Sequence, residues 1–142
     1  MSSHDELLEY LVKRVEVIEA SINVILYVNG LIIAGNMISS KKYYDKMSTF
    51  FDETKITTDD PSLREKGRAY MQQVKQFMQE KRRSKEEQDN PKYIHLDNVV
   101  MYPSDPLKPF GANVWRGKLS SVDAFSVGTA YWEYKPVEDV TD

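Results

Sequence analysis

The stretch VWRGKL, from Val114 to Leu119, sets a tryptophan and an arginine inside a segment that reads as a β-strand. Arg116 can contact nucleic acid, serve a catalytic site, or make a charge-assisted bond to a carboxylate or a turn carbonyl that locks a small fold together. Gly117 beside it allows the strand to bend. The rest of the chain has to decide among these roles.

The sequence contains few residues of the types that usually act in catalysis. The sequence has two histidines and no cysteine, and it contains no P-loop, dinucleotide-binding or zincin pattern. His4 lies near the start of the chain, and His95 reads as a strand-surface residue hydrogen-bonded to a neighbour. The serine pairs at 39–40 and 120–121 fit a helix start and a turn. The sequence therefore predicts no catalytic residue, no metal site, no cofactor and no enzyme.

Nucleic acid is not the predicted partner either. Nineteen basic residues stand against twenty-two acidic ones, a formal net charge of −3, so no net positive field attracts phosphate backbones. The basic run at 81–85 is flanked by Glu80, Glu86, Glu87 and Asp89, so its field cancels within about one Debye length of ~8 to 10 Å. A solvated helix end explains this run.

The composition also predicts where in the cell the protein is located. The absence of cysteine is typical of a chain made in a reducing compartment. The first residues carry acids where a signal peptide carries bases, and the most apolar stretch, from Val24 to Ile38, is too short and too broken to cross a bilayer. The sequence predicts a soluble cytoplasmic protein without membrane insertion.

The 142 residues predict one domain with an insertion. Periodicity and turn signals give a helix over about 4–19, a hairpin over about 22–38, a helical insertion over about 40–88, strands over about 92–132, and a loose acidic tail over about 135–142. Asp60-Pro61 marks a helix start, and that helix is expected to fray beyond Gln79.

Asn29-Gly30 carries the hairpin prediction, because both residues tolerate the positive φ of a type I′ turn. Gly35, in the second strand, suits a bulge or sharp bend. The predicted fold is α+β: a small, strongly bent, five-stranded antiparallel β-barrel of Sm-like or SH3-like type, with an N-terminal helix and a helical insertion between strands two and three.

The late Arg116-Gly117 pair with an early bent strand is similar to the Sm-like fold, which keeps a small-barrel RNA-binding module as the alternative function. In RNA-binding Sm-like proteins, an Asp and an Asn from the loop after the second strand complete the base pocket. The corresponding segment here, 39–43, reads SSKKY and has neither, which speaks against an RNA site.

Three segments in order, VNGLIIAGNMISSKKYYDKMSTFF, YIHLDNVVMY and VWRGKLSSVDAFSVG, resemble the gas vesicle accessory protein U (GvpU) family. The family pattern has an NG turn, an apolar-x-G-x-x-I-S segment leading to an aromatic helix, an IHL-x-N strand, and a WRGK strand ending in V-x-G-F-x-x-G. Ala124 stands where glycine is expected. The resemblance covers about two thirds of the chain and omits the first helix, the charged helix end and the tail.

The resemblance implies a non-enzymatic accessory protein that binds the gas vesicle shell or other vesicle proteins and influences vesicle assembly or clustering. A homo-oligomer is a further expectation, because an oligomeric partner gains avidity on the repetitive wall of a vesicle. Tryptophan and tyrosine supply much of the binding energy at protein interfaces. The candidate interface residues are Trp115, Arg116, Tyr131, Trp132 and Tyr134. Core packing explains Trp115 at least as well as an interface does.

Overall fold

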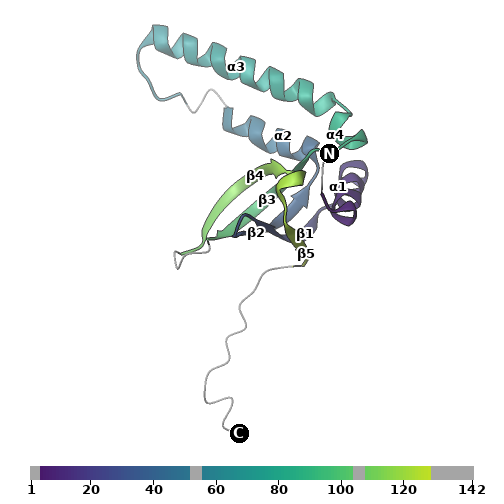
Figure 1. Ribbon diagram of the computed structural model, residues 1–142. Helices are drawn as coiled ribbons and strands as arrows, with labels where there is room; N and C mark the ends of the chain where they lie inside the picture. The colour runs from purple at the N-terminus through teal and green to yellow at the C-terminus, as the bar shows by residue number, and fades with distance from the viewer. Residues whose placement is uncertain (1–3, 52–55, 104–107, 129–142) are drawn as a thin grey trace.

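A computed structural model describes residues 4–51, 56–103 and 108–128 of the chain (Figure 1). In chain order its elements are α1 (Glu6–Ile18), β1 (Ile22–Val28), β2 (Leu31–Ile38), α2 (Ser40–Ser48), the 3-10 turn η1 (Thr49–Phe51), α3 (Pro61–Arg83), α4 (Glu86–Asp89), β3 (Tyr93–Tyr102), β4 (Phe110–Lys118), the 3-10 turn η3 (Leu119–Ser121) and β5 (Ala124–Val127).

The five strands form one antiparallel sheet in the order β4-β3-β2-β1-β5. The predicted turn joins β1 to β2, with φ of 50° at Asn29 and 80° at Gly30, as a type I′ turn requires. Asp123 braces this turn, because its carboxylate accepts a hydrogen bond of 2.9 Å from the Asn29 backbone N–H. The α+β class and the five antiparallel strands are confirmed.

Closure into a barrel is not confirmed. Within the described residues β4 pairs only with β3 and β5 pairs only with β1, so these two strands are the open edges of the sheet. β5 has only four residues, so few of its backbone groups could form hydrogen bonds with a second neighbouring strand. The structure is therefore an open, bent sheet where the sequence predicted a barrel.

The predicted irregularity at Gly35 is present. The register between β2 and β3 shifts between Ala34 and Asn36, and a Cβ at Gly35 would lie 2.9 Å from the backbone oxygen of Asp97. Real Cβ atoms are not found that close to a carbonyl oxygen, so the two backbones approach here only because Gly35 has no side chain. The sheet bends at this bulge.

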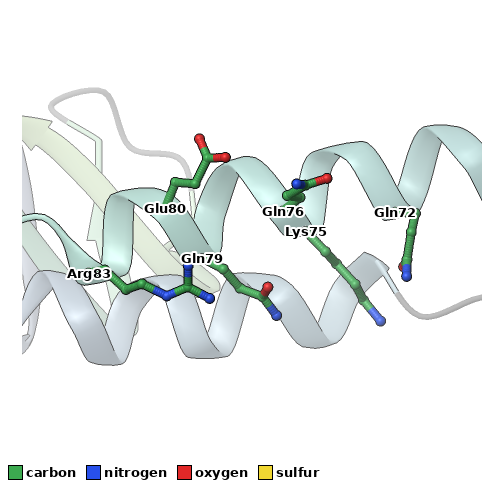
Figure 2. A pocket seen from close by; sticks show the side chains of 6 residues that line it. All are labelled: Gln72, Lys75, Gln76, Gln79, Glu80 and Arg83. Carbon is green, nitrogen blue, oxygen red and sulfur yellow. The ribbon is translucent and has the colours of Figure 1, made fainter.

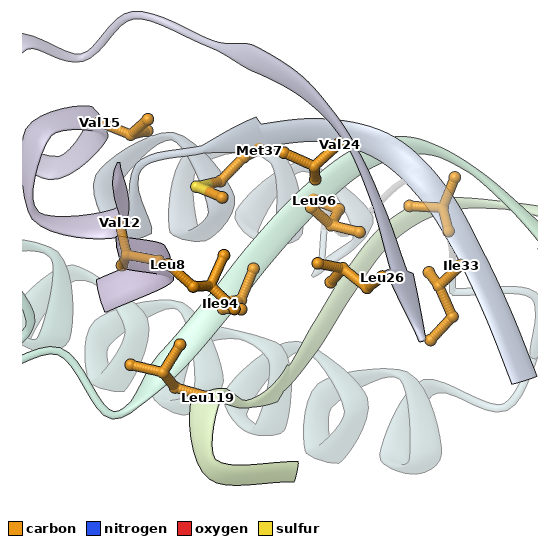
Figure 3. Packing of buried hydrophobic residues seen from close by; sticks show 11 residues of the cluster. Leu8, Val12, Val15, Val24, Leu26, Ile33, Met37, Ile94, Leu96 and Leu119 are labelled. Carbon is orange, nitrogen blue, oxygen red and sulfur yellow. The ribbon is translucent and has the colours of Figure 1, made fainter. Parts of the chain in front are cut away.

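One face of the sheet packs against α1 and forms the core (Figure 3). The first helix presents Leu8, Val12 and Val15 at helical spacing, and each of these side chains is buried. The strands contribute alternate residues from the same face, and η3 closes one end. The buried partners are Val24, Leu26, Ile33, Met37, Ile94, Leu96, Val99 and Leu119.

The helical insertion covers part of the other face. α2 contacts β3 and β4, and α3 packs on α2 as an outer layer (Figure 1). Asp60 caps α3, accepting a hydrogen bond of 2.9 Å from the Ser62 backbone N–H. The predicted fraying beyond Gln79 is wrong, since α3 continues to Arg83. Basic residues in the last turn stabilise the C-terminus of a helix, because they oppose its dipole. Arg82 in this turn also donates a hydrogen bond of 2.6 Å from its Nε to the Asp45 carboxylate in α2.

A carboxylate from α1 fixes the start of α2. Glu16 is buried and accepts hydrogen bonds from the Ser40 backbone N–H at 2.6 Å and from the Ser40 hydroxyl at 2.7 Å. Burial raises the pKa of the Glu16 carboxyl, and the two bonds from Ser40 oppose that rise. An acceptor at a helix N-terminus satisfies N–H groups that the helix itself leaves free. These two hydrogen bonds join α1 to the start of α2.

Candidate functional site

The WRG segment lies in β4 with its side chains alternating between the two faces of the sheet. Trp115 pairs with Leu96, and Gly117 pairs with Ile94, so both belong to the core face. Arg116 pairs with His95 and belongs to the outer face, on the side of α2. The three residues thus act in two different layers of the protein.

Trp115 folds back over Gly117. The indole ring is half-buried and packs against the core, and it occupies the space that a Cβ at Gly117 would need. Gly117 is therefore required by the close approach of this ring. The sequence predicted that Gly117 lets the strand bend, whereas the structure gives it the additional task of accommodating Trp115.

Arg116 makes its contacts with aromatic rings. Its Nε donates a hydrogen bond of 3.1 Å to His95 Nε2, and its guanidinium carbon lies 3.6 Å from the centre of the Tyr93 ring, a cation–π contact. A guanidinium can only donate, so His95 Nε2 carries no proton and the neutral ring is protonated at Nδ1. The carboxylate or turn carbonyl expected as the partner of Arg116 is replaced by histidine and tyrosine.

His95 is sealed between the sheet and α2. Its side chain is 1% exposed, and the Tyr43 ring lies 4.7 Å from its own, measured between centroids. Burial, together with the positive charge of Arg116, lowers the pKa of His95 to about 3. A buried ring that stays neutral at physiological pH is unsuited to proton transfer with a bound substrate.

Ion pairs also connect α2 to the sheet beside His95. Asp97 is buried, and its Oδ2 lies 3.4 Å from Lys46 Nζ and 3.9 Å from Lys42 Nζ, both in α2. Burial raises the pKa of the hydroxyls of Tyr43 and Tyr44, and the Arg116 charge opposes that rise. We call the residues of this layer the α2 clamp. They are Lys42, Tyr43, Tyr44, Lys46, Tyr93, His95, Asp97 and Arg116.

The hollow along α3 does not resemble an enzyme site. A hollow of about 420 Å³ runs along α3, and Figure 2 shows that one helix supplies its whole polar lining of Gln72, Lys75, Gln76, Gln79, Glu80 and Arg83. A second hollow, of about 230 Å³, lies over the sheet near Gly35 and Gly128. Among the described residues, no three histidine, aspartate or glutamate side chains are placed to hold a metal ion. Small-ligand sites usually combine an apolar lining with convergent polar groups.

The candidate interface residues fall into two groups. Trp115 and Arg116 are engaged within the protein, although Arg116 still exposes part of its side chain. Tyr131, Trp132 and Tyr134 lie outside the described residues. Sequence reasoning did not bring Tyr43, His95 and Asp97 together, although the alternation of His95 and Asp97 in one strand placed them on the same face.

Arg116→Ala is expected to lower the stability of the protein by about 1 kcal/mol, because it leaves a buried His95 nitrogen without its donor. In a domain of this size, such a loss lowers the melting temperature by about 2 to 4 °C. Thermal unfolding followed by circular dichroism measures it. An unchanged melting temperature together with lost binding to single-stranded RNA would instead support the Sm-like RNA module.

Comparison with known proteins gives one family. The model of the family described as "GvpU-like: Gas vesicle protein GvpU-like" matches residues 5–130, and this range includes α1 and every described strand. No curated protein and no solved structure gives a significant match. Within the described residues, no helix is both long and apolar enough to cross a membrane.

Proposed function

The chain belongs to the GvpU-like family of gas vesicle proteins, and from this membership we propose that it is a non-enzymatic accessory protein that binds gas vesicles and influences their assembly or clustering. The family match over residues 5–130 is the observation that carries the proposal. The proposed partners are the vesicle shell or other vesicle proteins, and the proposed location is the cytoplasm, on or near the vesicles.

The character of the surface supports binding over catalysis. The one histidine within the sheet is buried and neutral, whereas many large apolar side chains on the helices and edge strands are exposed. Exposed apolar groups are typical of protein interaction surfaces. A vesicle wall repeats the same protein surface many times, so a binding protein that also associates with itself gains avidity from effective concentration.

The proposed contact residues are the candidate interface residues, Trp115, Arg116, Tyr131, Trp132 and Tyr134. The aromatic side chains at 131, 132 and 134 have the chemistry of an interface hot spot, a large apolar area with a polar group at its edge. Trp115 and Arg116 would contribute the parts of their side chains that the α2 clamp and the core leave exposed.

Trp132→Ala with Tyr134→Ala is expected to reduce binding to gas vesicles about tenfold or more, because hot-spot truncations typically cost 2 kcal/mol or more. The measurement is the fraction of protein that rises with buoyant vesicles at several protein concentrations. Tyr27→Ala, which removes a partly exposed tyrosine from the sheet, is the matched control and should bind as the wild type does. Equal flotation of the double variant and the wild type would remove these aromatics from the interface.

A further inference from the structure

α3 carries an exposed apolar stripe. Leu63, Tyr70 and Phe77 follow each other at intervals of seven residues, close to two helical turns, so they lie along one side of the helix. Their exposed fractions are 54%, 61% and 58%. α3 buries a neighbouring side against α2, through Met78. None of the residues that the structure describes covers this stripe. We call Leu63, Tyr70 and Phe77 the α3 stripe.

α1 carries a second exposed apolar stripe. Leu7, Tyr10, Val17 and Ile18 lie outside the buried side of α1, which Leu8, Val12 and Val15 form. Tyr10 and Val17 lie opposite that side, and Leu7 and Ile18 lie along its edge. In chain order, their exposed fractions are 60%, 59%, 52% and 54%. We call Leu7, Tyr10, Val17 and Ile18 the α1 stripe. Two helices of one small protein thus each present a row of large apolar side chains to solvent. Apolar residues scattered singly over a surface are normal, whereas rows of them are typical of interaction sites.

The two helices have opposite charge. α3 has seven basic residues and two acidic ones, a net charge of +5. From its cap at Asp5 to Glu19, α1 has five acidic residues and two basic ones. Without Glu16, which is buried against Ser40, the net charge that α1 presents to solvent is −2. Like charges oppose the docking of α3 on α3 or of α1 on α1, and opposite charges favour α1 against α3.

We propose that the α1 stripe of one copy of the chain docks on the α3 stripe of a second copy, with the helices antiparallel. At 1.5 Å per residue, the α3 stripe is about 21 Å long and the α1 stripe about 17 Å, so they match in length. The antiparallel direction sets the acidic start of α1, at Asp5 and Glu6, beside the basic end of α3, at Lys81, and also opposes the two helix dipoles.

This contact is head-to-tail, because the two surfaces that meet are different. The docked pair keeps one free α3 stripe, on the first copy, and one free α1 stripe, on the second, so association continues into longer assemblies unless it closes into a ring. The inference goes beyond the proposed function by naming a second copy of the chain as the partner. Its consequence for clustering rests on that function: linked copies bound to different vesicles hold the vesicles together.

The test uses the protein without vesicles, in sedimentation velocity over a range of concentrations. The α1 variant carries Leu7→Gln, Tyr10→Gln and Val17→Gln, and the α3 variant carries Leu63→Gln, Tyr70→Gln and Phe77→Gln. Every replaced side chain is more than half exposed, so folding should survive, and circular dichroism checks this. Phe110→Gln, at an equally exposed phenylalanine on β4, is the matched control.

The wild type and Phe110→Gln should form species that grow with concentration, and high salt should weaken them. Each triple variant alone should associate at least about tenfold more weakly. An equimolar mixture of the two should form a 1:1 dimer and stop, because only one pair of intact stripes remains. A monomeric wild type, a triple variant that associates like the wild type, or a mixture that stays monomeric overturns the inference.

Failure here is separable from failure of the proposed function. A wild type that floats with vesicles yet is monomeric at all concentrations keeps the function and removes this contact. A wild type that associates as described yet never floats keeps the contact and removes the function. A wild type that assembles only when anionic lipid vesicles are added would assign the basic α3 to a lipid surface and overturn the docking of α1 on α3.

Discussion

Gly117→Ala lowers the stability of the protein by about 1 to 3 kcal/mol, the usual cost of overfilling a packed site. The added methyl group would overlap the indole ring of Trp115, which has to move out of its place against the core. Urea unfolding followed by circular dichroism measures the change as a shift of the midpoint with an unchanged slope. Alanine is normally the better residue in a strand, so a loss of stability points to the clash.

A double-mutant cycle provides the control for this result. In a Trp115→Ala background the ring is absent, and Gly117→Ala should then be neutral or slightly stabilising, because alanine restricts the unfolded chain more than glycine does. An equal loss in both backgrounds would mean that Gly117 is required by its backbone and not by Trp115.

Acidification from pH 7 to pH 4 is expected to remove about 3 kcal/mol of stability through His95 alone. Burial and the Arg116 charge lower the pKa of the folded-state ring to about 3, whereas the ring in the unfolded chain has a pKa of about 6.5. Between these values the unfolded chain binds a proton that the folded protein does not. Stability contributed by the neutral ring is therefore present above pH 6.5 and is lost as the pH falls toward 3.

His95→Gln isolates this contribution. Glutamine can accept the hydrogen bond from Arg116 and does not titrate, so the variant should lose about 3 kcal/mol less than the wild type over the same pH range. Burial of Glu16 and partial burial of Glu87 raise the pKa of each carboxyl, and the two groups act in the opposite direction. Both are present in the two proteins, so their effect cancels in the comparison. Identical pH dependence in the two proteins would show that His95 is protonated without cost.

Local signals account for the parts of the fold that could be predicted. Asn29-Gly30 determines the turn and the pairing of β1 with β2, because both residues tolerate a positive φ. Gly35 permits the close approach of the Asp97 carbonyl oxygen at the bulge, because it has no side chain. Asp60-Pro61 marks the start of α3 for the same kind of reason. Each of these features depends on residues close together in the sequence.

Closure of the sheet depends on residues far apart, and its prediction failed. Whether β4 and β5 meet is determined by the total bend and by the length of both edges, and β5 has only four residues. Turn residues and alternation specify which strands exist and which face is apolar, but they carry no information about the angle accumulated across five strands.

In the candidate site, too, the features that depend on neighbouring residues were predicted, and those that depend on distant residues were not. Alternation placed His95 on the outer face and predicted a hydrogen bond to a neighbour, and the bond to Arg116 is present. The expectation of a strand-surface position was wrong, because α2 covers that half of the sheet and leaves His95 1% exposed. The covering helix starts next to β2 in the sequence, but its packing direction is determined by Glu16 in α1 and Asp97 in β3.

Flotation of the wild-type protein tests the proposal that this protein binds gas vesicles. Purified protein is mixed with intact vesicles, or with vesicles washed free of accessory proteins, at several ionic strengths, and the buoyant layer is assayed for the protein. We expect saturable flotation with intact vesicles, and flotation with washed vesicles as well if the shell itself is the partner. Protein that remains below the buoyant layer with both preparations at every ionic strength would show that this protein does not bind gas vesicles.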